Sequence, residues 1–114
     1  MLSDKEINIL ECIIDFCERI EKKMAGVKKR SFKEDQDLQE IVCFNVIQIG
    51  EVANKLPKEF IKKYNKQPWV DIIGMRNVMV HAYSSVEEKD MWTCATKEIK
   101  PLKDYCKTIL EINK

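Results

Sequence analysis

An arginine and a histidine lie five positions apart in the second half of the chain. His81 is the only histidine among 114 residues, and Arg76 precedes it. A guanidinium group binds and neutralises phosphate oxygens through its planar fork of N–H donors. An imidazole accepts or donates a proton near neutral pH. The two residue types together are suited to breaking a phosphodiester bond, so Arg76 and His81 are the candidate catalytic residues.

The spacing within this segment limits how one helix could present the two groups. Pro68 is well placed to start a helix that runs through both. On such a helix Asn77 and His81 lie one turn apart on one face, whereas five residues turn Arg76 away from His81 by roughly 140°. A site therefore requires either a helix that loosens near His81 or a second chain that presents the same motif across a shared cleft.

The sequence around these residues resembles the HepT-like branch of the HEPN superfamily. The resemblance rests on segments 68–77 (PWVDIIGMRN) and 81–83 (HAY), and on an upstream segment, 49–53 (IGEVA). Many relatives carry an aspartate where this chain has Ala82, which puts the fine tuning of the histidine in doubt. The arginine, asparagine, histidine and tyrosine of the family motif are all present.

The resemblance implies a toxin ribonuclease that cleaves RNA without a metal or cofactor. Arg76 and His81 would be catalytic and Asn77 supporting, at a cleft shared by two chains of a homodimer. Glu51 would either anchor Arg76 or line that cleft. The family also implies a nucleotidyltransferase antitoxin as partner, which in some pairs transfers AMP to the motif tyrosine, here Tyr83. The apolar side chains of Trp69, Ile72 and Ile73 add to the expectation of a second chain.

Each of these residues also has a structural interpretation. A histidine near a helix end is often a cap that favours the helix dipole. Arg76 could be the ion-pair partner of Glu51, and Tyr83 could be a half-buried aromatic. Gly50 inside a helix costs about 1 kcal/mol relative to alanine, and close helix contact would explain it. Two alternatives to catalysis therefore stay open: a non-catalytic helical partner of a nucleotidyltransferase, and a structural dimer held by ion pairs.

Composition predicts one soluble helical domain spanning residues 1–114. Hydrophobic residues make up 45% and charged residues 34%, while three glycines and three prolines are few for a turn-rich fold. The net charge of +1 gives no strong field for nucleic acid, so RNA binding would need a local patch. No apolar run has the length of a membrane span, and the polar start is unlike a signal peptide. We expect a cytoplasmic protein.

Two classes of site are disfavoured by the residues present. The five cysteines form no Cys-x-x-Cys pair, which favours small buried side chains in a reducing compartment over a zinc site. A di-metal carboxylate bundle needs Glu-x-x-His motifs, and His81 has no glutamate three residues before it. No glycine-rich phosphate loop is present either. We therefore predict no metal ion and no nucleotide-hydrolase activity.

The apolar periodicity predicts an all-α fold: an up-and-down four-helix bundle with one short extra helix. Ser3 with Glu6 predicts the start of the first helix and Ser31 with Glu34 that of the second. Pro57 precedes the short piece and Pro68 the third long helix. Ser84 and Ser85 predict the start of a fourth helix, which Pro101 should kink or split.

Overall fold

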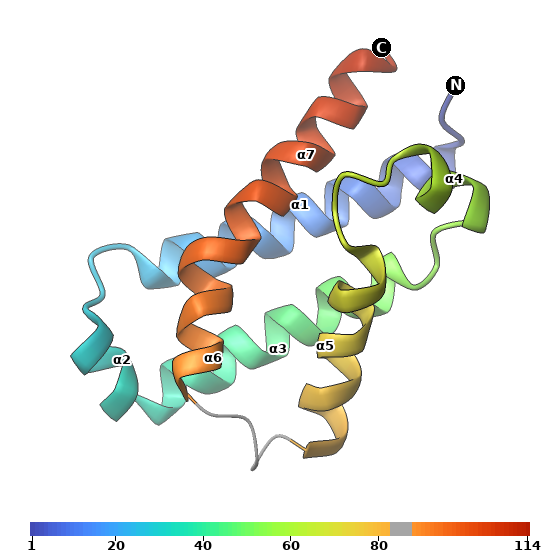
Figure 1. Cartoon of the computed structure of the whole chain (residues 1–114). Helices are drawn as coiled ribbons and strands as arrows, with labels where there is room; N and C mark the ends of the chain where they lie inside the picture. The colour runs from blue at the N-terminus through green and yellow to red at the C-terminus, as the bar shows by residue number, and fades with distance from the viewer. Residues whose placement is uncertain (83–87) are drawn as a thin grey trace.

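The computed structural model describes residues 1–82 and 88–114, and the side chains of all of these except residues 78, 80–82, 88 and 89. The described chain is helical and contains no strand, which confirms the all-α fold (Figure 1). Its elements are α1 (Asp4–Met24), α2 (Lys29–Glu34), α3 (Gln36–Ala53), α4 (Lys58–Lys63), α5 (Trp69–Ala82), α6 (Glu88–Thr93), a π-helical turn (Cys94–Glu98) and α7 (Ile99–Ile112).

The first helix begins as its sequence predicts. The Ser3 hydroxyl accepts a hydrogen bond from the Glu6 N–H at 3.1 Å, and the Glu6 carboxylate accepts one from the Ser3 N–H at 2.9 Å. This reciprocal capping box satisfies two backbone donors that a helix start otherwise leaves open. One face of α1 then supplies the centre of the core through Leu10, Ile13 and Ile20, all fully buried.

The predicted start of the second long helix was wrong. Ser31 lies inside the short α2, which ends at Glu34, and a separate long helix, α3, begins at Gln36. Its N-cap is Asp35, whose carboxylate accepts a hydrogen bond from the Leu38 N–H at 3.0 Å. A carboxylate at this position satisfies a free N–H and also favours the positive end of the helix dipole. The bundle therefore has two short extra helices, α2 and α4, instead of one.

The helix starts predicted at Pro57 and Pro68 lie where the sequence indicates. Pro57 is the N-cap of α4, and α5 starts directly after Pro68. Trp69, the first residue of α5, is 2% exposed, and its indole N–H donates to the Tyr64 carbonyl oxygen at 2.6 Å. Trp69 is thus a core residue, so the expectation that it adds to a contact with a second chain was wrong.

The last helical stretch is interrupted just before Pro101. A π turn over Cys94–Glu98 separates α6 from α7, and Pro101 is the third residue of α7. Proline has no N–H to donate to the preceding turn, so a change of hydrogen-bond register there costs less than in a regular helix. The predicted caps at Ser84 and Ser85 lie outside the described residues.

Four long helical stretches form the bundle, and consecutive ones reverse direction. In Figure 1, α1 and α3 run in opposite directions across the view, and α5 descends while α6 and α7 ascend. The most extensive packing is between α3 and α5 and between α1 and its neighbours α3 and α7. Of the described helices, none combines the length and apolar character needed to cross a bilayer. The helix that carries Arg76 and His81 is α5, and α3 is the helix that it packs against most extensively.

Candidate active site

The site begins with the close approach of α3 and α5 at Gly50. A Cβ atom added to Gly50 would overlap the Cβ of Arg76 and lie 2.9 Å from the Arg76 Cγ and 3.4 Å from the Ile72 carbonyl oxygen. Any larger residue at position 50 would therefore push the two helices apart. The glycine sets the separation at which the arginine of α5 passes across α3.

Glu51, the next residue of α3, fixes the guanidinium group of Arg76. The Arg76 Nε–H donates to Glu51 Oε1 at 2.5 Å, and Nη2 contacts the same oxygen. Arg76 Nη1 donates to the side-chain oxygen of Asn77, its neighbour on α5. The expected ion pair between Arg76 and Glu51 is present. Asn77 holds Arg76 in this arrangement, a partner that the helical spacing did not predict.

Arg76 keeps hydrogen-bonding capacity beyond these two partners. Its side chain is 29% exposed, and that of Glu51 is 42% exposed. A guanidinium group has five N–H donors, and the bonds to Glu51 and Asn77 engage three of them. The remaining donors belong to the two terminal nitrogens, which are the pair that grips a phosphate in bidentate recognition. An anion could approach from the solvent side without breaking the pair with Glu51.

The backbone places His81 near the end of the same helix. α5 is α-helical through Ala82, so it does not loosen ahead of His81. Five residues of regular helix separate positions 76 and 81 by roughly 140° around the axis of α5. The His81 side chain and the whole of Tyr83 lie outside what the structure describes. The structure therefore brings Glu51, Arg76 and Asn77 together and leaves the place of the imidazole and the tyrosine as predictions.

Ligands for a metal do not gather in the described part of the chain. Among those residues no three His, Cys, Asp or Glu side chains are arranged to hold an ion. Four of the five cysteines are buried and Cys12 is partly exposed. Burial raises the pKa of Cys17 and Cys106 to about 12, because the interior disfavours the thiolate. These thiols behave as small apolar side chains of the core.

Comparisons with known proteins identify the family. A family model described as "Ribonuclease HepT-like" matches residues 13–109, which is most of the chain. A protein of Caldanaerobacter subterraneus subsp. tengcongensis named "Putative RNase TTE0752" is 35% identical over 92% of this chain and 94% of its own length. No solved structure gave a significant match.

Two archaeal proteins extend the comparison. "Probable ribonuclease HepT" of Thermococcus cleftensis is 29% identical over 82% of this chain and 86% of its own length. A Methanocaldococcus jannaschii protein named "Gamma-glutamylcyclotransferase and putative RNase MJ0434" is 32% identical over 94% of this chain. The match covers 49% of that second protein, so a unit of this size also occurs within a longer chain. The family model over residues 13–109 and the relative that is 35% identical show that the chain belongs to the HepT-like ribonuclease family.

Proposed function

We propose that this protein is a metal-independent endoribonuclease and the toxin of a toxin–antitoxin pair. The observation that carries the proposal is the anchored Arg76, held by Glu51 and Asn77 on the helix that also bears His81. An arginine that serves only as a structural link has no need of donors directed to solvent. Here the two terminal nitrogens keep donors that neither Glu51 nor Asn77 engages, on a side chain that is 29% exposed.

The proposed reaction is an internal transesterification of RNA. The substrate's 2′-hydroxyl oxygen forms a bond to the adjacent phosphorus, and the bond from phosphorus to the 5′-oxygen of the next nucleotide breaks. His81 takes the 2′-hydroxyl proton or delivers a proton to the leaving 5′-oxygen. Arg76 stabilises the negative charge that grows on the non-bridging oxygens of the phosphorane. Glu51 and Asn77 keep the guanidinium fixed, so little reorganisation accompanies the reaction.

A homodimer supplies the geometry that a single α5 lacks. Val70 is 76% exposed at the start of α5 and Phe44 is 57% exposed on α3. Val70 and Asn77 are seven residues apart and share a face of α5, and Phe44 and Glu51 share a face of α3 in the same way. Exposed apolar side chains on the faces that carry the site favour contact with a second copy. A two-fold axis would then bring Arg76 of one chain and His81 of the other to one cleft.

The partner proposed from the family is a nucleotidyltransferase antitoxin that transfers AMP to Tyr83. The hydroxyl oxygen of Tyr83 would attack the α-phosphorus of ATP, with pyrophosphate as the leaving group. The bound adenylate would add bulk and negative charge two residues after His81. It would block RNA and repel the phosphates that Arg76 is proposed to hold.

RNA cleavage by purified protein in the presence of EDTA tests the proposal. We expect His81→Ala and Arg76→Ala each to lower the rate by about 10² to 10⁴, because each removes a role in the transition state. Lys55→Ala, which changes an exposed residue outside the motif, serves as the matched control. Tyr83→Phe should cleave like wild type and, by intact mass, take up no AMP from the cognate partner. Full activity of His81→Ala, or loss of all cleavage in EDTA, would overturn the mechanism.

The Arg76–Glu51 ion pair supports one second candidate, a non-catalytic helical partner of the nucleotidyltransferase. A salt bridge between two bundle helices is common in proteins without any activity. Under this function Arg76→Ala would lower stability and partner binding, and no variant would change an RNA cleavage rate. The same assay with His81→Ala therefore separates the two functions.

A further inference from the structure

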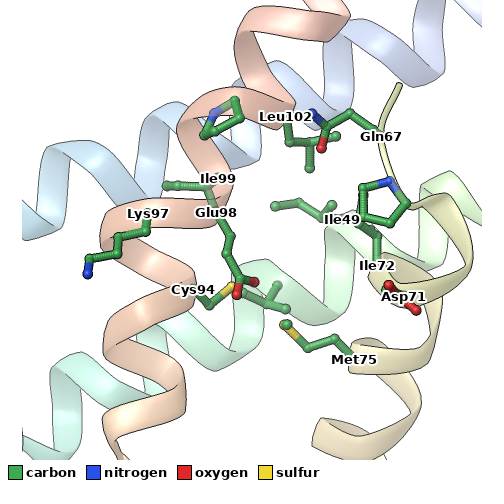
Figure 2. A pocket seen from close by; sticks show the side chains of 13 residues that line it. Ile49, Gln67, Asp71, Ile72, Met75, Cys94, Lys97, Glu98, Ile99 and Leu102 are labelled. Carbon is green, nitrogen blue, oxygen red and sulfur yellow. The ribbon is translucent and has the colours of Figure 1, made fainter. Parts of the chain in front are cut away.

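A cavity of about 450 Å³ is lined by Asp71, Ile72 and Met75 of α5. Its face of α5 is adjacent to the face that carries Arg76. The cavity lies between α3, α5, the π turn and the first turn of α7 (Figure 2). This volume is within the range of small-molecule binding sites, roughly 300–1,000 Å³. Protein interiors are otherwise packed almost without voids, so an opening of this size between three helices calls for an explanation.

The walls of the cavity are apolar and belong to the rigid part of the bundle. Ile49 of α3 and Ile99 and Leu102 of α7 line it, and each is at most 4% exposed. Ile72 and Met75 close the α5 side and are partly exposed. Such walls favour an aliphatic or aromatic body over a polar one. The packing of these residues into the core means that the shape exists before any ligand arrives.

Two carboxylates give the cavity its charge preference. Asp71 comes from α5 and Glu98 from the end of the π turn. Figure 2 shows the Glu98 carboxylate extending into the space between the helices towards Met75, while the Lys97 side chain points away from it. Within the described chain neither Asp71 nor Glu98 forms an ion pair. Among the described residues, no ion pair therefore neutralises these two carboxylates, and Lys97, the cation that also lines the cavity, points away from Glu98.

The electrostatic influence of Glu98 reaches the buried wall. The pKa of Cys94 is raised to about 12, first by burial and next by the negative charge of Glu98. Cys94 lines the same cavity and is 4% exposed. A carboxylate that disfavours a thiolate here would favour a cation in the same place.

We propose that this cavity binds a small organic cation, an apolar body of roughly six carbons that carries a primary amine. The alkyl part lies against Ile49, Ile72, Ile99 and Leu102, the ammonium group donates to Glu98, and Asp71 adds negative charge at the same opening. A carboxylic acid of the same length is repelled by both carboxylates, and a neutral alcohol lacks the charge-assisted bond. The site is separate from the catalytic residues proposed above and does not depend on their function.

A matched ligand series tests the proposal on the intact protein. Affinities of n-hexylamine, 1-hexanol and hexanoate are measured by calorimetry, and the site is located from methyl NMR shifts. We expect n-hexylamine to bind at least about fivefold more tightly than 1-hexanol, a difference of about 1 kcal/mol. The methyl signals of Ile72 and Ile99 should shift, and those of Ile13, buried on α1, should not.

Charge-removing variants identify the carboxylates. Glu98→Gln and Asp71→Asn should each weaken n-hexylamine binding, by about fivefold for Glu98→Gln, and leave 1-hexanol binding unchanged. Glu59→Gln on α4 and Asp37→Asn on α3 change carboxylates that, like Asp71 and Glu98, are exposed but lie outside the cavity, and these changes should have no effect. The proposal fails if 1-hexanol or hexanoate binds as tightly as the amine. It also fails if the Glu98→Gln, Asp71→Asn double variant binds n-hexylamine like wild type, or if no cavity methyl signal shifts at any concentration.

Discussion

At the scale of single residues, Gly50, Glu51 and Arg76 act together. Gly50 allows α5 to approach, Arg76 crosses α3 at that point, and Glu51 holds its guanidinium group. The sequence predicted the close helix contact, because a glycine inside a helix costs stability unless another helix needs the space. It left two roles open for Glu51, and the structure shows the one in which Glu51 anchors Arg76. The bond from Arg76 to Asn77 was not predictable, since helical periodicity describes faces and not the rotamers of adjacent side chains.

Two glycine substitutions give a matched test of this contact. Gly50→Ala adds a methyl group that overlaps Arg76, and Gly74→Ala adds one with nothing within 4 Å. We expect Gly50→Ala to lower the free energy of unfolding by about 1–2 kcal/mol, because overpacking outweighs the gain in helix propensity. Gly74→Ala should raise the free energy by up to about 1 kcal/mol. Urea titrations at one protein concentration measure both, and equal effects of the two changes would contradict the contact.

At the scale of elements, the boundaries show where sequence patterns succeed. The proline starts of α4 and α5 and the capping box of α1 were all predicted correctly, because each rests on local chemistry. The Ser31–Glu34 pair had the same form as the Ser3–Glu6 pair, yet Ser31 lies within α2. Asp35 caps α3 instead, while Ser31 and the buried Phe32 belong to the separate helix α2.

Removal of each candidate cap separates the two assignments. Asp35→Ala should lower the free energy of unfolding by about 1 kcal/mol, because the Leu38 N–H loses its acceptor. Ser31→Ala replaces an exposed residue inside a short helix and should change the free energy by less than about 0.5 kcal/mol. Chemical denaturation of both variants gives the comparison. A larger loss for Ser31→Ala than for Asp35→Ala would indicate that Ser31, and not Asp35, caps the long helix.

At the scale of the whole molecule, the chain is a bundle whose cavity could not be predicted from its sequence. The cavity residues come from α3, α5 and the last helical stretch, and each carboxylate by itself looks like part of a solvated helix face. Only the packing of three distant segments, with the π turn at Glu98, places Asp71 and Glu98 at one apolar opening. The fold class followed from periodicity because the long helices α1 and α7 each carry a clear apolar stripe.

The proposed dimer predicts complementation between two inactive chains. Equal amounts of Arg76→Ala and His81→Ala chains would form mixed dimers in half of the pairs. Each mixed dimer then has one intact pair of Arg76 and His81, so we expect about one quarter of wild-type cleavage. The measurement is the initial rate after mixing, with light scattering to establish the dimer. A monomer at micromolar concentration, or no recovery on mixing, would rule out a shared cleft.

The buried indole at the start of α5 offers a view of the catalytic helix in solution. Trp69 is seven residues before Arg76, two turns along the same face, and its ring packs near Phe60 and Tyr105. The chain has one other tryptophan, Trp92, so Trp92→Phe leaves a single emitter. Any movement of α5 that exposes this ring to water would shift its fluorescence to longer wavelength. The fluorescence of Trp69 can thus report the binding of substrate, partner or cavity ligand to the protein without an added label.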